Sequence, residues 1–192
     1  MQARLLDIDT ALLSEHCVVR RFREGDGQAF YELLRDNHPR LVDHFPTLLR
    51  EVNDADKAEC YIRRKLAAWL VQEEFCFGLW ENESAELIGK LRLFHIDWSL
   101  PRAEVSYFID QHFGGRGLMT EALKRLLQFA FKQLLVEKLL LRTAMDNFTS
   151  QRLARKCGFR REGDLRAEFR RGGGELIDVM LFGLTRSEYE KV

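Results

Sequence analysis

The amino-acid sequence predicts a single α/β domain built on a mixed sheet. Its 192 residues are the length of one domain, and a hydrophobic content of 46% is sufficient for a buried core. Stretches with the two-residue period of strands alternate with stretches of helical period. No internal repeat, low-complexity tract or linker-like composition divides the chain. We therefore expect one domain over residues 17–188, preceded at 1–16 by an arm or a short helix without the features of a signal peptide.

The first half of the domain is expected to begin with a strand at 17–22. A helix should open at Gly25-Asp26 and end before Pro39, because the residue before a proline is biased away from helical geometry. Asp54 is expected to cap a long amphipathic helix, since its carboxylate can accept from a first-turn amide. Two strands joined by a polar turn should follow at 75–80 and 87–96.

The second half is expected to alternate strands and helices. A strand at 103–109 leads into a glycine-rich turn, and apolar residues then recur at helical spacing up to Leu134. The strand at 139–144 begins with continuous apolar residues, which suits a strand covered on both faces. Asn147 should cap a helix that ends at Gly158. The last strands are expected around 159–161 and at 176–184.

Composition excludes several classes of protein. A formal net charge of +0 disfavours a nucleic-acid binder that relies on a global basic field. No apolar run is long enough to span a bilayer. The four cysteines and five histidines are scattered without the spacing of metal ligands. These features favour reduced, buried thiols in a cytoplasmic protein, with no metal, no membrane and no direct nucleic-acid partner.

The turn Gly114-Gly115-Arg116-Gly117 is the most informative part of the sequence. A strand, a glycine turn and a helix N-terminus together present free backbone N–H groups and the positive end of a helix dipole, which is a geometry that binds phosphate. Two common nucleotide motifs do not fit. The dinucleotide fingerprint requires glycine where this chain has Thr120, and the Gly-Lys-Ser/Thr of a Walker A loop is absent.

Two segments in register resemble a known family. The segment from Arg116 to Ala122 resembles the pyrophosphate loop of the GNAT superfamily of N-acetyltransferases, whose usual pattern is Gln/Arg-x-x-Gly-x-Gly/Ala. Gly114, Gly117 and Met119 stand in its three defined positions, so the first and last depart from it. The segment 146–150, followed by Cys157-Gly158-Phe159, resembles the Asn-x-x-Ser … Gly-Phe signature of the branch that acetylates ribosomal-protein N-termini, the RimJ/RimL type.

This resemblance implies a fold and a cofactor. The fold would be GNAT-like, a mixed and strongly twisted sheet of about seven strands flanked by helices on both faces. The acyl donor would be acetyl-CoA, bound without a metal. Carried over residue by residue, the cofactor-binding positions would be Phe108, Ile109, Gly114, Gly115, Arg116, Gly117, Leu118, Met119, Thr120, Asn147 and Ser150.

The resemblance also implies catalytic roles, each with a plainer alternative. A backbone N–H at Phe108 or Ile109 would polarise the thioester carbonyl, where an ordinary strand would pair it. Ser150 would donate to the coenzyme A sulfur, although a first-turn serine often bonds only to backbone. Glu168 would be the base, although a glutamate among arginines is usually a solvated partner. Glu104, next to the cofactor face, competes for that role.

Elementary acid–base chemistry bears on the acceptor. An α-amino group with a pKa near 7.7–8.0 is about 10–20% neutral at pH 7, whereas roughly four lysine amines in ten thousand are neutral. A modest carboxylate base therefore suffices for a protein or peptide N-terminus. A small-molecule amine (polyamine, amino acid or antibiotic) is the alternative acceptor, and a non-catalytic coenzyme A-binding module is the alternative function. Either a monomer or a homodimer is compatible with the sequence.

Overall fold

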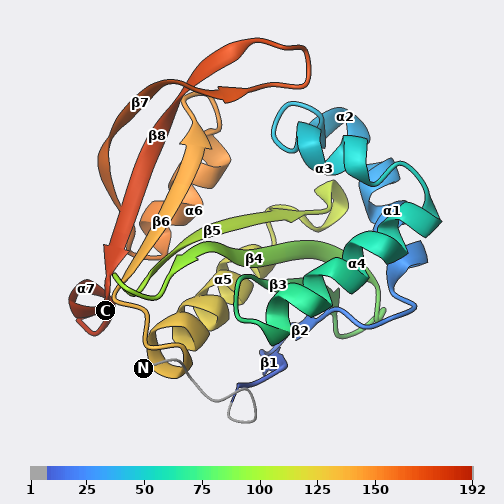
Figure 1. Ribbon diagram of the computed structural model, residues 1–192, viewed down its shortest axis with the longest axis horizontal. Coiled ribbons are helices and arrows are strands. Elements are labelled where there is room, and N and C mark those ends of the chain that lie inside the picture. Colours follow the sequence, from blue (N-terminus) through green and yellow to red (C-terminus); the bar gives the residue numbers. More distant parts are fainter. Residues whose placement is uncertain (1–7, 192) are drawn as a thin grey trace.

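The computed structural model describes residues 8–191 and confirms an α/β domain on one mixed sheet (Figure 1). The strands lie in the order β1-β2-β3-β4-β5-β6-β8-β7, and β5 and β6 are the parallel pair. Their bounds are β1 Ala11–Leu13, β2 Cys17–Arg21, β3 Phe75–Glu81, β4 Leu87–Asp97, β5 Arg102–Ile109, β6 Lys138–Ala144, β7 Arg160–Arg170 and β8 Leu176–Thr185.

The sheet has one strand more than the sequence predicts. β1 lies in the segment expected to be an arm or a short helix, and it pairs antiparallel with β2, with Ala11 opposite Arg20. Three residues are too few to show a strand period, so the pattern did not reveal it. Residues 1–7 of the expected arm lie outside the described residues.

The helices follow the predicted start and stop signals. Asp54 accepts from Lys57 N at 2.6 Å, and Asn147 accepts from Ser150 N at 3.0 Å, so both predicted caps are confirmed. Gly158 has φ +92° at the end of its helix. The helices are α1 Gly27–Asp36, α2 His38–Leu41, α3 Pro46–Glu51, α4 Ala55–Leu70, α5 Leu118–Gln128 with a π-helical turn Phe129–Gln133, α6 Phe148–Lys156 and α7 Arg186–Tyr189.

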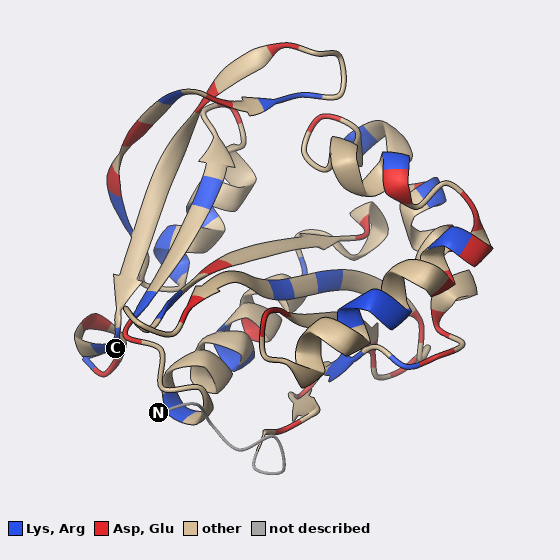
Figure 2. Cartoon of the chain, viewed as in Figure 1, with Lys and Arg blue, Asp and Glu red and all other residues tan. Residues whose placement is uncertain are grey.

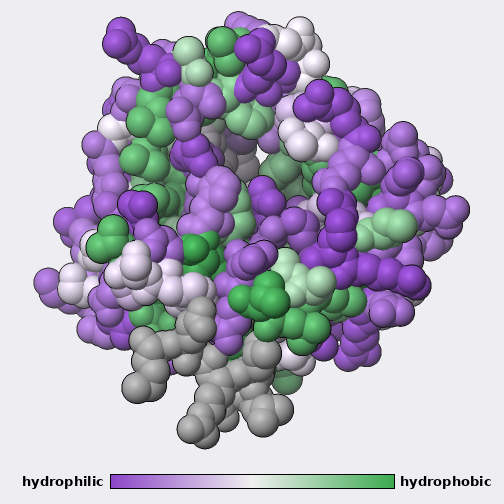
Figure 3. Space-filling model, viewed as in Figure 1, coloured by the Kyte–Doolittle hydropathy of each residue, from purple (hydrophilic) through white to green (hydrophobic). Residues whose placement is uncertain are grey.

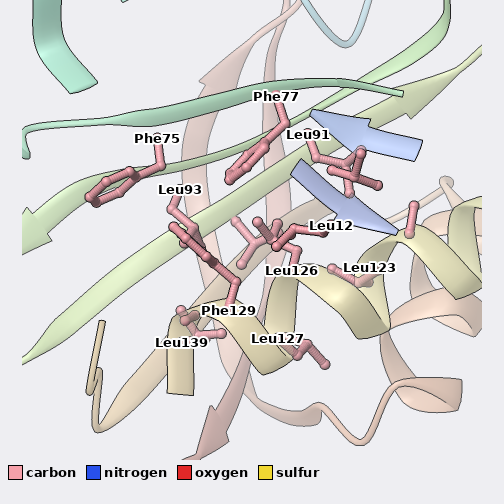
Figure 4. Close-up of a cluster of buried hydrophobic side chains, with 14 of the residues drawn as sticks. Leu12, Phe75, Phe77, Leu91, Leu93, Leu123, Leu126, Leu127, Phe129 and Leu139 are labelled. Carbon is pink, nitrogen blue, oxygen red and sulfur yellow. The ribbon is translucent and has the colours of Figure 1, made fainter. Parts of the chain in front are cut away.

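Two apolar clusters lie on opposite faces of the sheet. Figure 4 shows the larger cluster, where the side chains of Phe75, Phe77 and Phe129 meet the leucines of α5. On the other face, α1 and α4 pack through Phe30 and Ile62. Helices on both faces hold the sheet rigid and thereby fix the ends of its central strands.

The sheet opens between β5 and β6. The pairing of these two strands runs from Arg102–Lys138 to Glu104–Leu140. Beyond it, β5 stays paired with β4 up to Ile109, and β6 stays paired with β8 up to Ala144. The two strands therefore diverge towards their carboxyl ends (Figure 1).

The last hairpin is longer than the sequence predicts. β7 continues to Arg170, whereas the sequence predicted a strand only around residues 159–161. The prediction was too short because most side chains of β7 are exposed and many are charged, so they give no apolar period. A bulge falls between Leu165 and Phe169, where Ala167 has φ +50° and its amide donates to Asp178 Oδ1 at 2.9 Å. At the tip, a Cβ on Gly172 would lie 2.6 Å from Val42 O, so the hairpin reaches the connection between α2 and α3.

Candidate active site

A cavity of about 760 Å³ lies where the sheet opens. Its walls come from β4, β5, β6, the glycine turn, α6, the α2–α3 segment and β7. In the space-filling view the molecule is hollowed between the β7–β8 hairpin and α2–α3 (Figure 3). The cavity brings together all but one of the predicted site residues: Glu104, Phe108, Ile109, Gly114, Gly115, Gly117, Leu118, Met119, Thr120, Asn147, Ser150 and Glu168.

The glycine turn forms one end of the cavity with its backbone exposed. Gly115 and Gly117 have φ +80° and +83°, which favour glycine, and a Cβ on either would meet open space. Gly117 is the N-cap of α5, and its carbonyl accepts from Glu121 N at 3.0 Å. Among the described residues no side chain caps this helix end. The amides of residues 118–120 therefore face the cavity without an intrahelical partner.

A buried asparagine holds this turn against the first helix. Asn37, 1% exposed, donates from Nδ2 to Asp110 Oδ2 at 2.6 Å, and its Oδ1 accepts from Gln111 N at 3.0 Å. Asp110 in turn accepts from His112 N at 2.7 Å in the 3-10 turn that precedes Gly114. Sequence reasoning missed this brace, because its two parts lie 73 residues apart.

Two charged side chains near the turn, those of Arg116 and Glu121, do not reach the cavity. Arg116 is absent from the cavity wall, and its guanidinium lies 3.8 Å from Glu81 and 5.0 Å from the ring centre of Phe113. Its side chain therefore points away from the cavity. Glu121 accepts from His16 N at 3.2 Å on the far side of α5.

The alternation of β5 decides which amides face the opening. Asp110 N donates to Ile88 O at 2.7 Å, so even-numbered residues of this stretch direct their N–H groups to β4. The amide of Phe108 therefore points to β4, and those of Tyr107 and Ile109 point to the side where β6 has diverged. Of the two predicted carbonyl-binding amides, the geometry favours Ile109.

Two hydroxyl groups meet in the middle of the cavity wall. Tyr107 Oη lies 3.1 Å from Ser150 Oγ, and Ser150 N is fixed by the Asn147 cap. Burial raises the pKa of Tyr107, so the phenol stays protonated near neutral pH. Sequence reasoning did not single out Tyr107; its place one residue before Phe108 on the strand that enters the glycine turn was the available signal.

The two candidate base residues share one arginine. Arg142 donates to both oxygens of Glu104, at 2.8 and 2.6 Å, and to Glu168 Oε1 at 2.5 Å. Glu104 also lies 3.2 Å from His95 Nδ1. The Glu104 side chain is 11% exposed and that of Glu168 is 37% exposed. The hydrogen bonds that Arg142 donates to Glu104, and also to Glu168, raise the pKa of Arg142, so its charge is permanent.

Arg142 is a further residue that sequence reasoning missed. It was visible as a charged residue inside the apolar strand 139–144. Its side chain lies on the face of β6 opposite to Leu139 and Leu141, which are buried in the core.

The remaining wall lies under α2 and the β7 strand. Arg40 donates to the carbonyl of Ile109, and Phe45 packs on Phe108 with ring centres 5.2 Å apart. Burial, the largest cause, lowers the pKa of His44, which is therefore mainly neutral at pH 7. Arg92 and Phe94 of β4 complete this side.

The described residues hold no group of three or more side chains suited to a metal ion. Within residues 8–191 no helix is both long and apolar enough to cross a bilayer.

Comparison with known proteins identifies the family. A model of the acetyltransferase (GNAT) domain matches residues 16–160. The N-acetyltransferase p20 of Bacillus licheniformis is 31% identical over 59% of this chain and 63% of its own length, so less than two thirds of p20 is matched. YdaF of Bacillus subtilis, whose name describes it as a ribosomal N-acetyltransferase, is 25% identical over 94% of this chain and 97% of its own length.

A solved structure supports the fold. The ribosomal-protein-S5-alanine acetyltransferase from Vibrio fischeri superimposes with a TM-score of 0.85, over 94% of this chain and 99% of that one, at 17% identity. The RimJ/RimL-type resemblance is thereby confirmed at the level of fold. Because the family model covers most of the chain, the opened sheet and the glycine turn are those of an acetyltransferase: the chain belongs to the GNAT acetyltransferase family.

Proposed function

We propose that this chain transfers acetyl from acetyl-CoA directly to the N-terminal α-amine of a protein or peptide. The observation that carries the proposal is the cavity itself. It joins a phosphate-binding helix end, a hydroxyl pair and two carboxylates along one continuous wall. The name of YdaF and the fold of the S5-alanine acetyltransferase support the choice of a protein N-terminus.

The glycine turn fits the diphosphate of the donor. The free amides of residues 118–120 and the dipole of α5 favour an anion, and the open space at Gly115 and Gly117 leaves room for close approach. The gap between β5 and β6 would receive the pantetheine arm, with Asn147 and Ser150 at its side. When bound, acetyl-CoA supplies an activated acyl group as a thioester.

The hydroxyl pair is suited to protonate a leaving thiolate. Ser150 Oγ faces the cavity and lies within hydrogen-bond distance of Tyr107, whose raised pKa keeps its proton available. The amide of Ile109, on the same wall, is placed to stabilise negative charge on a carbonyl oxygen.

Glu168 is better placed than Glu104 to accept a proton from the acceptor amine. Glu104 has both oxygens bound to Arg142 and one close to His95. Glu168 receives one bond from Arg142 and is more exposed on the hairpin that closes the cavity. A carboxylate of this kind is a weak base, which suits an α-amine with a pKa near 7.7–8.0 better than a lysine near 10.4.

The experiment is incubation with acetyl-CoA and a panel of acceptors, with free thiol and acceptor mass as the readouts. Free peptide N-termini should be acetylated, and the same peptides with a blocked α-amine should not, even when they contain lysine. Turnover restricted to spermidine or an aminoglycoside would replace the protein acceptor with a small molecule. Tight acetyl-CoA binding without turnover of any acceptor, and with E168Q and S150A indistinguishable from the parent chain, would identify a non-catalytic module.

A further inference from the structure

A cluster of cations lies beneath the acceptor side of the cavity and is not used by the proposed chemistry. It consists of Lys65, Lys90 and Arg92 around the single carboxylate of Glu74. Lys65 Nζ lies 2.6 Å from Glu74 Oε2, and Arg92 Nη1 lies 3.5 Å from Glu74 Oε1. Lys90 is 4% exposed, with Nζ 5.2 Å from the ring centre of Tyr61. Figure 2 shows the basic positions on β4 beside those of α4.

The charges of this cluster do not balance. Burial raises the pKa of both Tyr61 and Cys76, so these neighbours are neutral at pH 7. Burial lowers the pKa of Lys90 to about 8, which still leaves it mostly protonated at pH 7. One carboxylate therefore faces three cations, and an additional anion would stabilise the cluster.

Arg92 connects the cluster to the cavity. It lines the cavity wall, and its guanidinium carbon lies 3.9 Å from the ring centre of Phe94, which also lines it. Arg92 Nε is buried and donates to no acceptor among the described residues. A guanidinium that lines the cavity and is held against an aromatic ring is suited to bind a carboxylate.

The opposite charge lies a short distance along the same face. Arg92 is paired with Ser106 across β4 and β5, and Phe94 is paired with Glu104. Arg92 and Glu104 are therefore diagonal neighbours in the sheet, with about 7–8 Å between their Cα atoms. Around Arg142, two carboxylates share one cation, so this end of the cavity is negative and the Arg92 end is positive.

This polarity fits an acceptor that carries both charges. An amine would lie at the Glu104–Glu168 end and a carboxylate at Arg92. An extended chain advances about 3.3–3.6 Å per residue, so two residues span the separation. A polyamine would instead place a second cation against Arg92.

We propose that Arg92 is a specificity-determining residue that binds a carboxylate on the acceptor, so that the preferred acceptors carry an acidic side chain on the residue after the reacting amine. This inference rests on the proposed acetyl transfer and refines its acceptor. The same carboxylate chemistry is present in a free acidic amino acid, which the experiment tests separately.

The experiment compares matched acceptors. Peptides identical except for Asp, Asn or Lys at their second residue are assayed for acetylation beside free glutamate, glutamine and spermidine. The parent chain should show a kcat/KM at least about tenfold higher for the Asp peptide than for the Asn peptide, since a hydrogen bond to a charged group contributes that much. The Lys peptide and spermidine should be the poorest acceptors. A stronger preference for glutamate over glutamine than for the Asp peptide over its Asn twin would assign Arg92 to a free amino acid and overturn the peptide form.

Variants then assign the preference to one side chain. R92Q should lower kcat/KM for the Asp peptide about tenfold, through KM, and leave the Asn peptide unchanged. R92K should retain part of the preference, and R35Q on the exposed surface of α1 should retain all of it. An equal loss on both peptides would mean that Arg92 only supports the fold, and an unchanged preference would remove it from recognition.

Binding is measured independently of turnover. In calorimetric titrations the parent chain should bind the Asp peptide more tightly than the Asn peptide, with a difference that shrinks as salt is added. Binding with this preference but without acetylation would refute the proposed activity and support the anion site. Acetylation without the preference would refute the anion site alone.

Discussion

The hydroxyl oxygens of Tyr107 and Ser150 lie 3.1 Å apart on the cavity wall, although the residues come from a strand and a helix 43 positions apart. Ser150 is fixed from behind by the Asn147 cap, so its Oγ stays directed to the wall. The helix start that the sequence predicts thus also orients the hydroxyl that we propose as the proton donor.

Loss of this donor should slow the chemical step. S150A is expected to lower kcat by about 10²-fold, since proton transfer by a positioned group contributes at least that much. Y107F should lower kcat less, because Ser150 remains. Acetyl-CoA affinity, measured by calorimetry, should change little in either variant, and S187A serves as the control. Full activity in S150A would restrict this serine to a structural role in the helix cap.

Replacement of Glu168 should produce a loss that depends on pH. E168Q is expected to reduce kcat/KM about 10²-fold at pH 7. The loss should shrink towards pH 9, because an α-amine with a pKa near 7.7–8.0 is then neutral without help. A pH–rate profile of parent and variant measures this. A loss of the same size at every pH would show that Glu168 positions the acceptor and removes no proton.

E104Q should act mainly on stability. The substitution leaves Arg142 with a neutral partner in a partly buried place, which is expected to lower the free energy of unfolding by about 1–3 kcal/mol. Urea denaturation measures the change, with E83Q in the exposed turn between β3 and β4 as the control. An unfolding free energy equal to that of the control would contradict the view that this ion pair joins β5 to β6.

Alanine at Gly117 should weaken donor binding. Its φ of +83° costs a non-glycine residue about 1–2 kcal/mol, and relaxation of that strain would turn the amides at the start of α5 away from the cavity. G117A is therefore expected to raise the Kd of acetyl-CoA about tenfold. G173A, in the tip of the β7–β8 hairpin, has open space and is the matched control. Equal affinities would argue against the glycine turn as the diphosphate site.

The buried Lys90 should make stability depend on pH. Burial lowers its pKa to about 8, whereas in the unfolded chain it remains near 10.5. Between these values the unfolded chain holds a proton that the folded chain has lost, so this group makes the free energy of unfolding rise with pH. The full penalty, on the order of 3 kcal/mol, is present below pH 8.

K90M should therefore be more stable than the parent chain at pH 7, and this advantage should shrink by pH 9.5. Urea denaturation of both proteins at the two pH values isolates the contribution of Lys90 from those of Cys76 and Tyr61, which titrate in both. K132M, on the exposed surface, is the control. An advantage that stays constant with pH would show that Lys90 is not desolvated in the folded chain.

Local chemistry made part of this structure predictable. The caps at Asp54 and Asn147 depend on side chains and amides three residues apart, and the turn at Gly117 requires a φ that glycine tolerates. The roles proposed for Ser150 and Glu168 came from the family resemblance. The main strands and the four longer helices were thus predicted, whereas the three-residue β1, the short helices α2, α3 and α7 and the length of β7 were missed.

Tertiary contacts account for the rest. The ion pairs of Arg142 depend on how β5, β6 and β7 meet, which no local pattern encodes. Arg116 matched the family segment, yet its side chain lies towards Glu81 and does not line the cavity. The motif located a glycine turn that lines the cavity, whereas the direction of the Arg116 side chain did not follow from it.

The contact between the β7–β8 tip and the α2–α3 connection has a consequence for access. Gly172 lies against Val42, and Arg171 pairs with Asp146, so the passage over Glu168 is bridged rather than open at the top. A bridged passage admits an extended chain end more readily than a surface loop. A lysine in the middle of a folded surface would reach the cavity only if the contact between the hairpin tip and the α2–α3 connection opened.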